Sequence, residues 1–528
     1  MKMHLPLWRW SLRSPAAKAI MVMVLFLIFF HIFRLREFRN LSLNKIPSVD
    51  SSTSAPKHPI DQLIYEHRLR YEELVKRQSR SPEEAIANYK IRYRRNPPTG
   101  FADWVQYALQ QNSTIIDDFD TIEKVLAPFR QLGPKRLKSR IESARRTGSR
   151  LQTVSIKNGT SSVEGSPMLN SLKHLLTKLP DMTFLLNELD EPRVIGSDSD
   201  KDDIIFRDYG RKPSWEQLTA SCKKTDSGGL KIRRSKDSDP PNEDQGDKTS
   251  LEVQQDQEPR FLESTSQSLD LCLNPSYQDQ YGMFTSPCTF LATEGLVPIF
   301  SVARVSTMRD ILIPGHDYHD ASFLSNDDLD PLNFTSKDNK LYWRGSNTGT
   351  YASSQMKWET NHRARFLLKV QNINKTDLFD VGMTAYIQCD WTVCEAMREA
   401  FGLPPRAGKG DSYKYKFVMD MDGNGYSGRF YRLLRSNSVV FKQTLVEQWH
   451  DDRVFPWVHY VPVTIGLDEI EHLVKYFSSG GQGARQAEEI AAESTSWMKA
   501  ALRPVDMTIY EYRLLLEYAS LFDSGDTS

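Results

Sequence analysis

The chain has 528 residues, enough for about two to four domains. Its 68 Lys and Arg residues balance its 68 Asp and Glu residues, which excludes the overall positive field of a nucleic-acid-binding protein. No two cysteines form a CxxC pair, so a zinc cluster is not expected. In an oxidising compartment they could form two disulfides and leave one free thiol, but the sequence does not pair them. The cysteines are Cys222, Cys272, Cys288, Cys389 and Cys394.

The N-terminal segment 16–33 is almost wholly apolar and long enough to span a bilayer. It lacks a small-residue cleavage pattern, which favours an uncleaved signal anchor over a cleaved signal peptide. Residues 1–15 would then form a cytosolic tail. The positively charged residues on both sides do not fix the orientation, but N-glycosylation triplets beyond the anchor favour a lumenal body. These triplets begin at Asn112, Asn158, Asn333 and Asn374.

Residues 34–60 contain many Ser, Pro and Lys residues and are predicted to form a flexible stem. A helical region is expected over 61–130. Within it, Ser81 has the position of a helix cap, followed by Pro82 at the first helical position and a Glu at the third. This helix should run to Tyr93, with further helices at 104–109 and 121–129.

A first α/β domain is predicted over 131–325. Met182–Leu186 is a hydrophobic strand that leads directly into Asn187–Arg193, and ligands bind at the C-terminal ends of strands in open α/β sheets. Segments 296–302 and 310–313 are further candidate strands. Residues 223–259 are polar and nearly free of aromatic side chains, which predicts a disordered insertion.

One loop of this domain is crowded with potential metal ligands. We nevertheless expect no metal there, because the spacing matches no standard motif and a single loop rarely supplies a complete shell. The residues are His316, Asp317, His319 and Asp320.

A second α/β domain is predicted over 326–528, and its central feature is segment 415–434. A strand at Tyr415–Met419 runs into a glycine-rich loop, after which Ser427 is placed to cap a helix carrying Arg429 in its first turn. A second strand, Ser438–Lys442, follows. This order presents backbone N–H groups and a helix N-terminus to phosphate, and Arg429 would add a forked donor. We interpret it as the diphosphate end of a nucleotide-sugar site; the alternative is an ordinary βαβ turn with a solvated arginine.

A similar pattern occurs at 339–349, where a strand runs into another glycine loop with Arg344 at its mouth. A helix at 358–370 carries Arg363 and Arg365. His459 interrupts an apolar strand at 457–463 and is expected to be a satisfied core residue. Amphipathic helices at 467–477, 484–501 and 506–522 close the chain.

Several of these segments together resemble glycosyltransferase family 90, which includes fungal capsule-associated transferases and Rumi-type protein O-glucosyltransferases. In chain order they are YWRGSNTG, KYKFVMDMDGNGYSGRFYRLL, SVVFK, EQW and PWVHYVPV. Upstream segments such as DMTFLLNELDEPRV look like the fungal members, and the resemblance covers roughly residues 96 to 522. It implies an α/β fold of the GT-B type. Two Rossmann-like domains would face each other behind the N-terminal transmembrane anchor and helical stem, with the nucleotide sugar in the C-terminal half.

The resemblance also implies an inverting, single-displacement reaction in which a carboxylate deprotonates the acceptor hydroxyl as UDP leaves. Asp190 matches the family's general base by its position in the NELDEP segment, and Arg344 and Arg429 match positions that contact the diphosphate. The other implied donor-site residues shape the two glycine loops or contact the nucleotide. They are Gly345, Ser346, Asp422, Gly423, Gly425, Tyr426 and Ser427.

No metal or other cofactor is expected, because two arginines and a helix terminus can neutralise the charge that develops on the leaving group. Two alternatives stay open. Asp420 and Asp422 spell a DxD pattern that would suit metal-dependent transfer, and the chain could instead be a catalytically silent, lectin-like or scaffolding homologue.

UDP-xylose is the favoured donor by resemblance to the capsule-associated members, with UDP-glucose open. The expected acceptor is a hydroxyl of a glycan or glycoprotein, and nucleic acid is not an expected partner. The chain ends without a KDEL-like signal, so we expect a Golgi, single-pass type II membrane protein with a lumenal catalytic region, and the ER as the alternative.

Overall fold

The computed structural model describes residues 58–196, 203–222, 260–319, 330–408 and 410–523. The predicted tail, anchor and most of the stem lie outside the described residues, as does the predicted insertion at 223–259. Among the described residues, no helix is both long and apolar enough to cross a membrane. Helix α2 (Pro59–Lys76), for example, has 18 residues but carries acidic and basic side chains along its length. The fold prediction is therefore corrected: the chain is α/β, and its transmembrane element has no support in the structure.

The N-terminal helices follow the sequence signals closely. α3 (Pro82–Tyr93) begins as predicted, because the Ser81 side chain accepts a hydrogen bond from the Glu84 N–H and Pro82 takes the first helical position. The predicted helices at 104–109 and 121–129 are slightly longer in the structure. The remaining helices before the second sheet are α4 (Phe101–Gln110), α5 (Asp120–Arg130), α6 (Gly133–Thr147), α7 (Pro167–Leu172), α8 (Trp215–Thr219), α9 (Thr265–Leu269) and α10 (Gly282–Thr285).

The N-terminal sheet differs from the expected Rossmann-like pattern, because it is mixed instead of parallel. Its strand order is β2-β1-β3-β7-β8, in which β1 is antiparallel to both of its neighbours while β3, β7 and β8 are parallel. The strands are β1 (Leu151–Lys157), β2 (Thr160–Ser161), β3 (Met182–Asn187), β7 (Ile299–Ser301) and β8 (Ile311–Leu312). A short three-stranded sheet lies nearby, with β4 (Val194–Ile195), β6 (Leu291–Glu294) and β5 (Ile205–Asp208) in that order.

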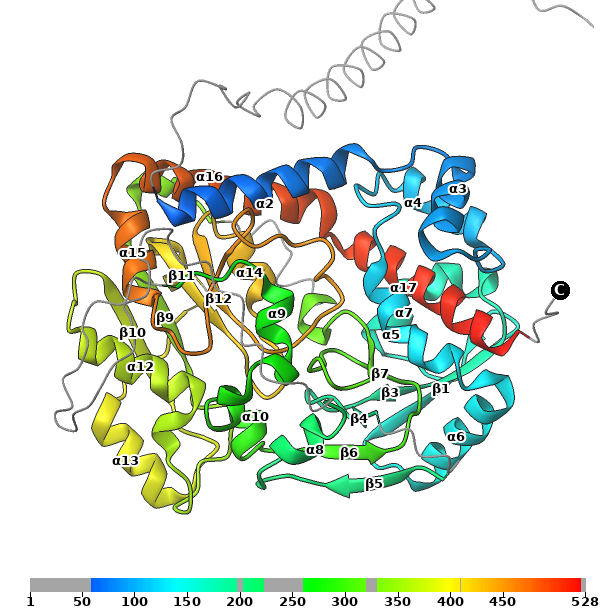
Figure 1. The fold of residues 1–528 in the computed structure, drawn as a ribbon, viewed down its shortest axis with the longest axis horizontal. Coiled ribbons are helices and arrows are strands. Elements are labelled where there is room, and N and C mark those ends of the chain that lie inside the picture. Colours follow the sequence, from blue (N-terminus) through cyan, green and yellow to red (C-terminus); the bar gives the residue numbers. More distant parts are fainter. Residues whose placement is uncertain (1–57, 197–202, 223–259, 320–329, 409, 524–528) are drawn as a thin grey trace, which may run out of the picture. The chain divides into compact units, whose positions relative to one another are not determined.

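The C-terminal sheet is fully parallel, as expected for an α/β domain. Its order is β10-β9-β11-β12-β13, with β11 in the centre (Figure 1). The strands are β9 (Asp338–Ser346), β10 (Phe379–Ala385), β11 (Tyr415–Met421), β12 (Val439–Gln443) and β13 (Val461–Pro462). The helices are α12 (His362–Ile373), α13 (Trp391–Phe401), α14 (Phe430–Leu434), α15 (Ile470–Ser478), α16 (Gly481–Ala501) and α17 (Pro504–Ala519).

The two faces of β11 belong to different hydrophobic cores. Phe417, Met419 and Met421 pack with α12, α15 and α16, whereas Val418 joins the larger core that also contains the N-terminal sheet. Side chains alternate along a strand, so Asp420 shares the face of Val418. The second sheet is thereby tied to the first through one continuous apolar core.

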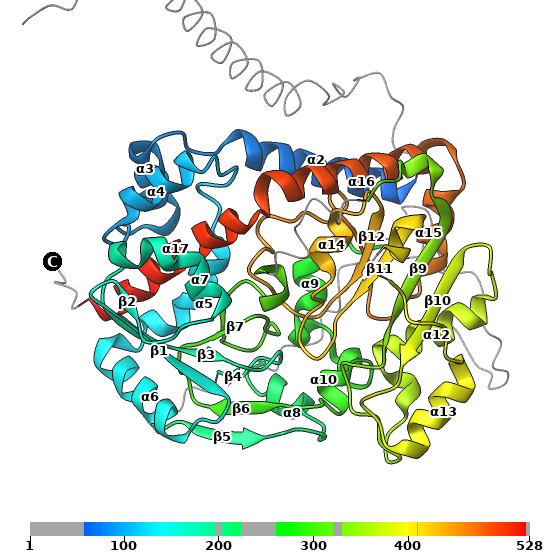
Figure 2. The ribbon, with the colours of Figure 1, turned by 180° about the vertical axis from the view of Figure 1, so that it is seen from behind.

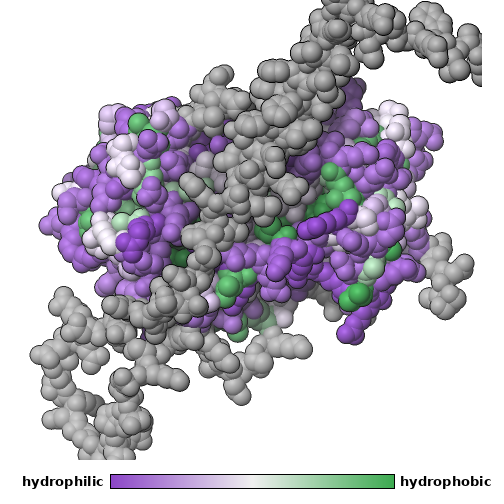
Figure 3. Space-filling model, turned by 90° about the horizontal axis from the view of Figure 1, so that it is seen from above, coloured by the Kyte–Doolittle hydropathy of each residue, from purple (hydrophilic) through white to green (hydrophobic). Residues whose placement is uncertain are grey.

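The last helix, α17, returns to the N-terminal half of the molecule (Figures 1 and 2). The Tyr518 hydroxyl donates to the Thr183 carbonyl of β3 at 3.0 Å, and the Tyr510 hydroxyl donates to the Leu312 carbonyl of β8 at 3.0 Å. The C-terminal segment thus completes the packing of the first sheet. On the face seen in Figure 3, hydrophilic residues predominate and hydrophobic ones form only small separate spots.

Candidate active site

The central glycine loop connects β11 to α14. The strand ends at Met421, and the short helix begins at Phe430 with Arg429 in the capping position. Ser427 does not cap this helix: its hydroxyl donates to the Asp420 carboxylate. Because α14 has only five residues, its N-terminus supplies less to an anion than the sequence suggested. Positive charge at this site must come mainly from side chains.

The Asp420 and Asp422 carboxylates form contacts with other groups of the protein. Asp420 is fully buried and forms an ion pair with Lys442 at 3.0 Å. Asp422 is also buried and accepts hydrogen bonds from the Tyr281 hydroxyl at 2.6 Å and the Leu445 N–H at 2.8 Å. Burial raises the pKa of Asp422, while Lys442 and these donors oppose the rise. Both side chains therefore stabilise the start of the loop through buried contacts.

The loop after β9 meets the central loop directly. The Gly349 N–H donates to the Asn424 side chain at 3.1 Å, and a Cβ on Gly349 would lie 2.8 Å from the Gly423 carbonyl oxygen. Gly349 has a φ of 101°, a backbone conformation that only glycine adopts without strain. Gly345 is equally crowded, since a Cβ there would lie 2.6 Å from the Trp343 ring.

Arg363 on α12 fastens the two loops to each other. Its buried guanidinium donates to the Asp422 carbonyl at 2.9 Å, the Met421 carbonyl at 3.2 Å and the Ser346 carbonyl at 3.0 Å. The sequence showed an arginine on a helix here but gave no reason to assign it a role. These contacts join backbone atoms of residues far apart in the chain, and no local pattern encodes them.

A cavity of about 300 Å³ lies against one face of the sheet, between β9, β11 and α14. Arg344 and Arg429, which were predicted to contact a diphosphate, both line it, and Arg406 and Arg432 add two guanidinium groups that the sequence analysis missed. Arg429 also donates to the Arg344 carbonyl, while the Arg344 guanidinium pairs with Asp380 and lies 5.0 Å from the Tyr342 ring centroid. Four arginines around one cavity form a site for a polyanion such as a diphosphate.

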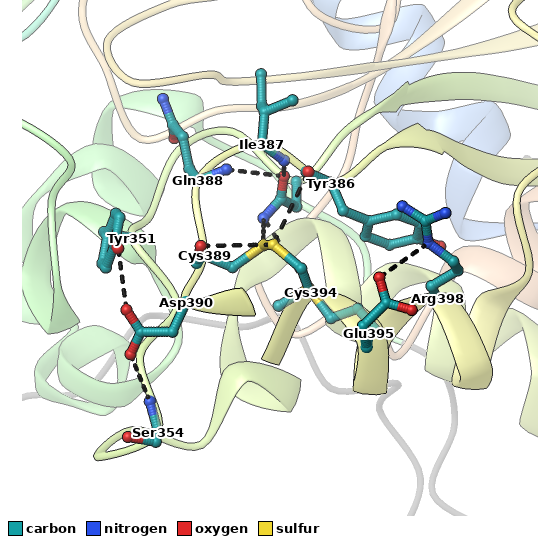
Figure 4. Close-up of a disulfide and its surroundings, with 12 residues drawn as sticks. Tyr351, Ser354, Tyr386, Ile387, Gln388, Cys389, Asp390, Cys394, Glu395 and Arg398 are labelled. Atoms are coloured by element: carbon teal, nitrogen blue, oxygen red, sulfur yellow. Dashed lines mark hydrogen bonds and ion pairs between the residues drawn. A yellow bond between two sulfur atoms is a disulfide. The ribbon is translucent and has the colours of Figure 1, made fainter. Parts of the chain in front are cut away.

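A disulfide lies in a segment that is hydrogen-bonded to the loop after β9 (Figure 4). Cys389 is paired with Cys394, five residues later. The Asn347 side chain accepts from the Ile387 N–H at 2.8 Å and donates to the Cys389 sulfur at 3.3 Å, and Gln388 accepts from the Gly349 N–H at 3.2 Å. A second disulfide joins Cys222 to Cys272, and Cys288 is free, so the chain contains the two pairs and one thiol that were considered from sequence.

Asp190 lies at the C-terminal end of β3 and contacts the central loop. A Cβ on Gly425 would lie only 1.9 Å from the Asp190 carbonyl oxygen, so the two loops touch at a place where only glycine fits. The turn itself is shaped by Asn187, whose side-chain amide donates to the Glu191 carbonyl at 2.7 Å. Asp190 is exposed on its open side, whereas Glu191 is buried and accepts from the Thr289 hydroxyl at 2.8 Å. Glu188 is exposed as well, but among the acids of this segment it is Asp190 that touches the central loop.

The electrostatic surroundings of Asp190 suit a general base. Partial burial raises the pKa of its carboxyl, Asp317 raises it further, and His316 acts in the opposite direction. Asp317 is itself fixed to the central loop, because the Tyr426 hydroxyl donates to it at 3.2 Å. The Tyr318 hydroxyl donates to the Ser427 carbonyl at 3.1 Å. The histidine-rich loop of the N-terminal half thus packs against the central loop, and among the described residues no group of three or more His, Cys, Asp or Glu could hold a metal ion.

His459 proves to be a core residue, as predicted. It is 1% exposed, stacks on Trp497 with ring centroids 5.2 Å apart and accepts from the Phe455 N–H at 2.9 Å. Burial lowers the pKa of His459 to about 3, so the ring is neutral at physiological pH.

Comparison with known proteins bears on this arrangement. Residues 288–527 match the family described as Glycosyl transferase family 90. Protein O-glucosyltransferase 3 of Rattus norvegicus is 26% identical over 239 residues, covering 43% of each chain. Protein O-glucosyltransferase 1 of Homo sapiens is 24% identical over 250 residues, covering 44% of this chain and 60% of the relative. The O-glucosyltransferase rumi homolog of Aedes aegypti is 33% identical over 116 residues, or 21% of this chain and 28% of the relative.

The chain thus spans about 43% to 60% of the length of the first two of these relatives. The matched region contains both glycine loops and all four cavity arginines, whereas Asp190 lies upstream of it. The resemblance noted from sequence is confirmed over residues 288–527, which match the model of glycosyltransferase family 90.

Proposed function

We propose that the chain is an inverting glycosyltransferase that moves a sugar from a UDP-sugar to a hydroxyl group of a glycan or glycoprotein. The observation that carries this proposal is the contact between Asp190 and Gly425, which brings a candidate base from one half against the donor loop of the other. The arginine-lined cavity beside that loop supports a diphosphate-containing donor. The relatives' names, which specify protein O-glucosyltransferases, support transfer to a protein hydroxyl.

In the proposed reaction, the Asp190 carboxylate accepts the proton of the acceptor hydroxyl as its oxygen attacks the anomeric carbon of the sugar. The bond from that carbon to the diphosphate oxygen breaks, and UDP leaves with the electron pair. Negative charge grows on the diphosphate during this step, so Arg344, Arg429, Arg406 and Arg432 would bind the transition state more tightly than the ground state. The proposal needs no resident metal ion.

UDP-xylose is our first choice of sugar donor and UDP-glucose the second. The site of action would be an oxidising, secretory compartment, with the Golgi lumen favoured. Two disulfides among five cysteines support such a compartment, because disulfides persist where thiols are not kept reduced.

UDP release from a panel of UDP-sugars, with and without saccharide and protein acceptors, tests the proposal. Asp190→Asn should lower kcat by about a thousandfold or more, because general-base catalysis contributes roughly 10²–10⁴-fold. The UDP dissociation constant should change less than twofold. Release at the wild-type rate by Asp190→Asn would overturn the assignment of the base. If the wild-type chain binds glycans but turns over none of the donors, it is a silent homologue.

A further inference from the structure

A second cavity lies in the N-terminal half and shares no lining residue with the arginine-lined one. Its volume is about 690 Å³, within the range of small-molecule binding sites. It is built by helices α4, α7 and α17 together with the loop of His316 and His319. The side chains that line it are Tyr107, Gln111, Pro167, Asn170, Ser171, His174, His316, His319, Pro504, Val505 and Thr508.

This cavity shares the loop of His316 and Asp317 with the proposed catalytic centre. His316 lines it, and Asp317, the next residue, contacts the donor loop through Tyr426. A Cβ on Gly428 of that loop would lie 1.9 Å from an Asp317 carboxylate oxygen. Burial lowers the pKa of His316 and the charge of Asp190 opposes that shift, which places the two side chains within electrostatic reach. A ligand that contacts His316 in this cavity would therefore lie near the proposed base.

The chemistry of the lining distinguishes this cavity from the arginine-lined one. It presents hydroxyl, amide and imidazole groups, and no Lys, Arg, Asp or Glu is among the described residues that line it. Such groups donate and accept hydrogen bonds without favouring a charged ligand. A phosphate or an acidic peptide would find no cation here, whereas a neutral polyol finds many partners.

The polar groups are also held in place before any ligand binds. The Tyr107 hydroxyl and His174 Nε2 are 3.0 Å apart and share a hydrogen bond. Behind the lining, buried Glu511 of α17 accepts a hydrogen bond from Ser171 and lies 3.1 Å from His319 Nε2. Fixing the lining in advance reduces the entropy lost on binding.

We propose that this cavity is the acceptor subsite and that it binds a neutral saccharide. The inference rests on the proposed function for its catalytic meaning and narrows the acceptor from glycan or glycoprotein to carbohydrate. The saccharide would occupy the space between α4, α7 and α17, with the hydroxyl to be glycosylated directed toward Asp190.

Direct binding tests this inference independently of catalysis. Isothermal titration calorimetry on the full chain would use p-nitrophenyl glycosides of xylose, glucose, mannose and galactose, with UDP titrated separately. We expect at least one glycoside to bind wild-type protein. His174→Ala should weaken it at least fivefold, and Asn170→Trp should abolish its binding by filling the cavity. Lys173→Ala is the matched control, because this exposed neighbour does not line the cavity and should bind like wild type.

UDP affinity should be unchanged in all three variants, which also shows that each is folded. Equal glycoside affinity in wild type, His174→Ala and Asn170→Trp would overturn the inference, as would binding of none of the glycosides. Selective glycosylation of a folded protein substrate, unaffected by Asn170→Trp, would overturn it in favour of a protein acceptor. Failure of the proposed function gives a different result: saccharide binding that depends on His174 and Asn170, with no UDP released from any donor.

Discussion

Asp190 is held between opposing electrostatic influences that determine when it can act as a base. Partial burial and the Asp317 carboxylate raise the pKa of Asp190, and His316 lowers it. Proton abstraction requires the ionised carboxylate, so transfer should fail as the pH falls through this raised pKa. The acid limb of the pH–rate profile should therefore lie above the pH expected for an ordinary aspartate.

The first prediction concerns Asp317→Asn. Removing the neighbouring negative charge should lower the pKa of Asp190 and move the acid limb of kcat to lower pH, while a structural defect would lower kcat at every pH. His316→Gln should move the limb in the opposite direction, because it removes the group that favours the ionised form. Initial rates from pH 4 to 8 measure both shifts. Limbs that coincide in wild type and both variants would exclude these neighbours as tuning groups.

Arg429 illustrates a second effect at the residue scale. Burial lowers the pKa of its guanidinium, and nearby Asp420 opposes that change, so the group is held charged at the wall of the cavity. Arg429→Ala should weaken UDP binding by about tenfold to a hundredfold, since a hydrogen bond to a charged group contributes about 1.5–3 kcal/mol. Calorimetry with UDP measures the loss. The control is Arg398→Ala, which removes an exposed arginine that pairs with Glu395 on the same helix.

At the scale of elements, the proposed donor site consists of the loops after β9 and β11. Residues that are distant in sequence hold these loops in place. The Cys389–Cys394 disulfide fixes the segment that binds Asn347 and Gly349, and Figure 4 shows that Asp390 in the same segment is bonded to Tyr351 and Ser354. The Cys222–Cys272 disulfide joins two segments outside both loops and encloses a much longer stretch of sequence. The two bridges should therefore differ in what their removal changes.

Replacing Cys389 and Cys394 by Ser should raise the KM for the UDP-sugar severalfold with a small loss of stability. Replacing Cys222 and Cys272 by Ser should leave this KM nearly unchanged and cause the larger loss of stability. Chain-entropy arguments give about 2 kcal/mol for the first bridge and about 4 kcal/mol for the second, because their sequence separations are 5 and 50. Donor kinetics and urea unfolding of both double variants test the contrast. An unchanged donor KM in the first variant would show that the loop holds its geometry without the bridge.

Local sequence signals predicted the elements well where chemistry and periodicity agree. The cap at Ser81, the strand at Met182 and the parallel strands around 415–443 all lie where the pattern placed them. Ser427 was assigned wrongly as a helix cap, because its hydroxyl donates a hydrogen bond to the nearby Asp420 carboxylate instead. Arg406 and Arg432 were missed because only the folded sheet brings them close to Arg344. The mixed N-terminal sheet was missed because the sequence of β1 carries no signal for the direction of the strand.

At the scale of the whole molecule, α17 connects the end of the chain to the N-terminal helices. Glu517 on this helix is 1% exposed and forms ion pairs with Arg513 at 2.9 Å, Arg95 at 3.0 Å and Arg130 at 3.2 Å. The Arg513 guanidinium also lies 4.3 Å from the Phe101 ring centroid of α4 and 4.7 Å from that of Trp104. One buried carboxylate thus pairs with three arginines from separate segments, and Glu123 adds a second carboxylate to Arg95 and Arg130.

The last prediction concerns this carboxylate. Burial tends to raise the pKa of Glu517, but Arg513, Arg95 and Arg130 outweigh it and lower the pKa overall. A carboxyl whose folded pKa is depressed stabilises the fold fully above its unfolded pKa, and the contribution is lost as the pH falls through the folded value. Glu517→Gln should therefore cost about 3–5 kcal/mol at pH 7, because it leaves buried Arg513 without its carboxylate partner, whereas Arg95 and Arg130 keep Glu123. The difference from wild type should shrink as the pH falls below the unfolded Glu pKa of about 4.3, because protonation of Glu517 then begins to favour the unfolded chain. Urea unfolding of both proteins at pH 7 and at pH 3.5 measures this, with exposed Glu142→Gln on α6 expected to match wild type at both values. If Glu517→Gln lowers the free energy of unfolding equally at both pH values, the charge of Glu517 is not what stabilises the fold.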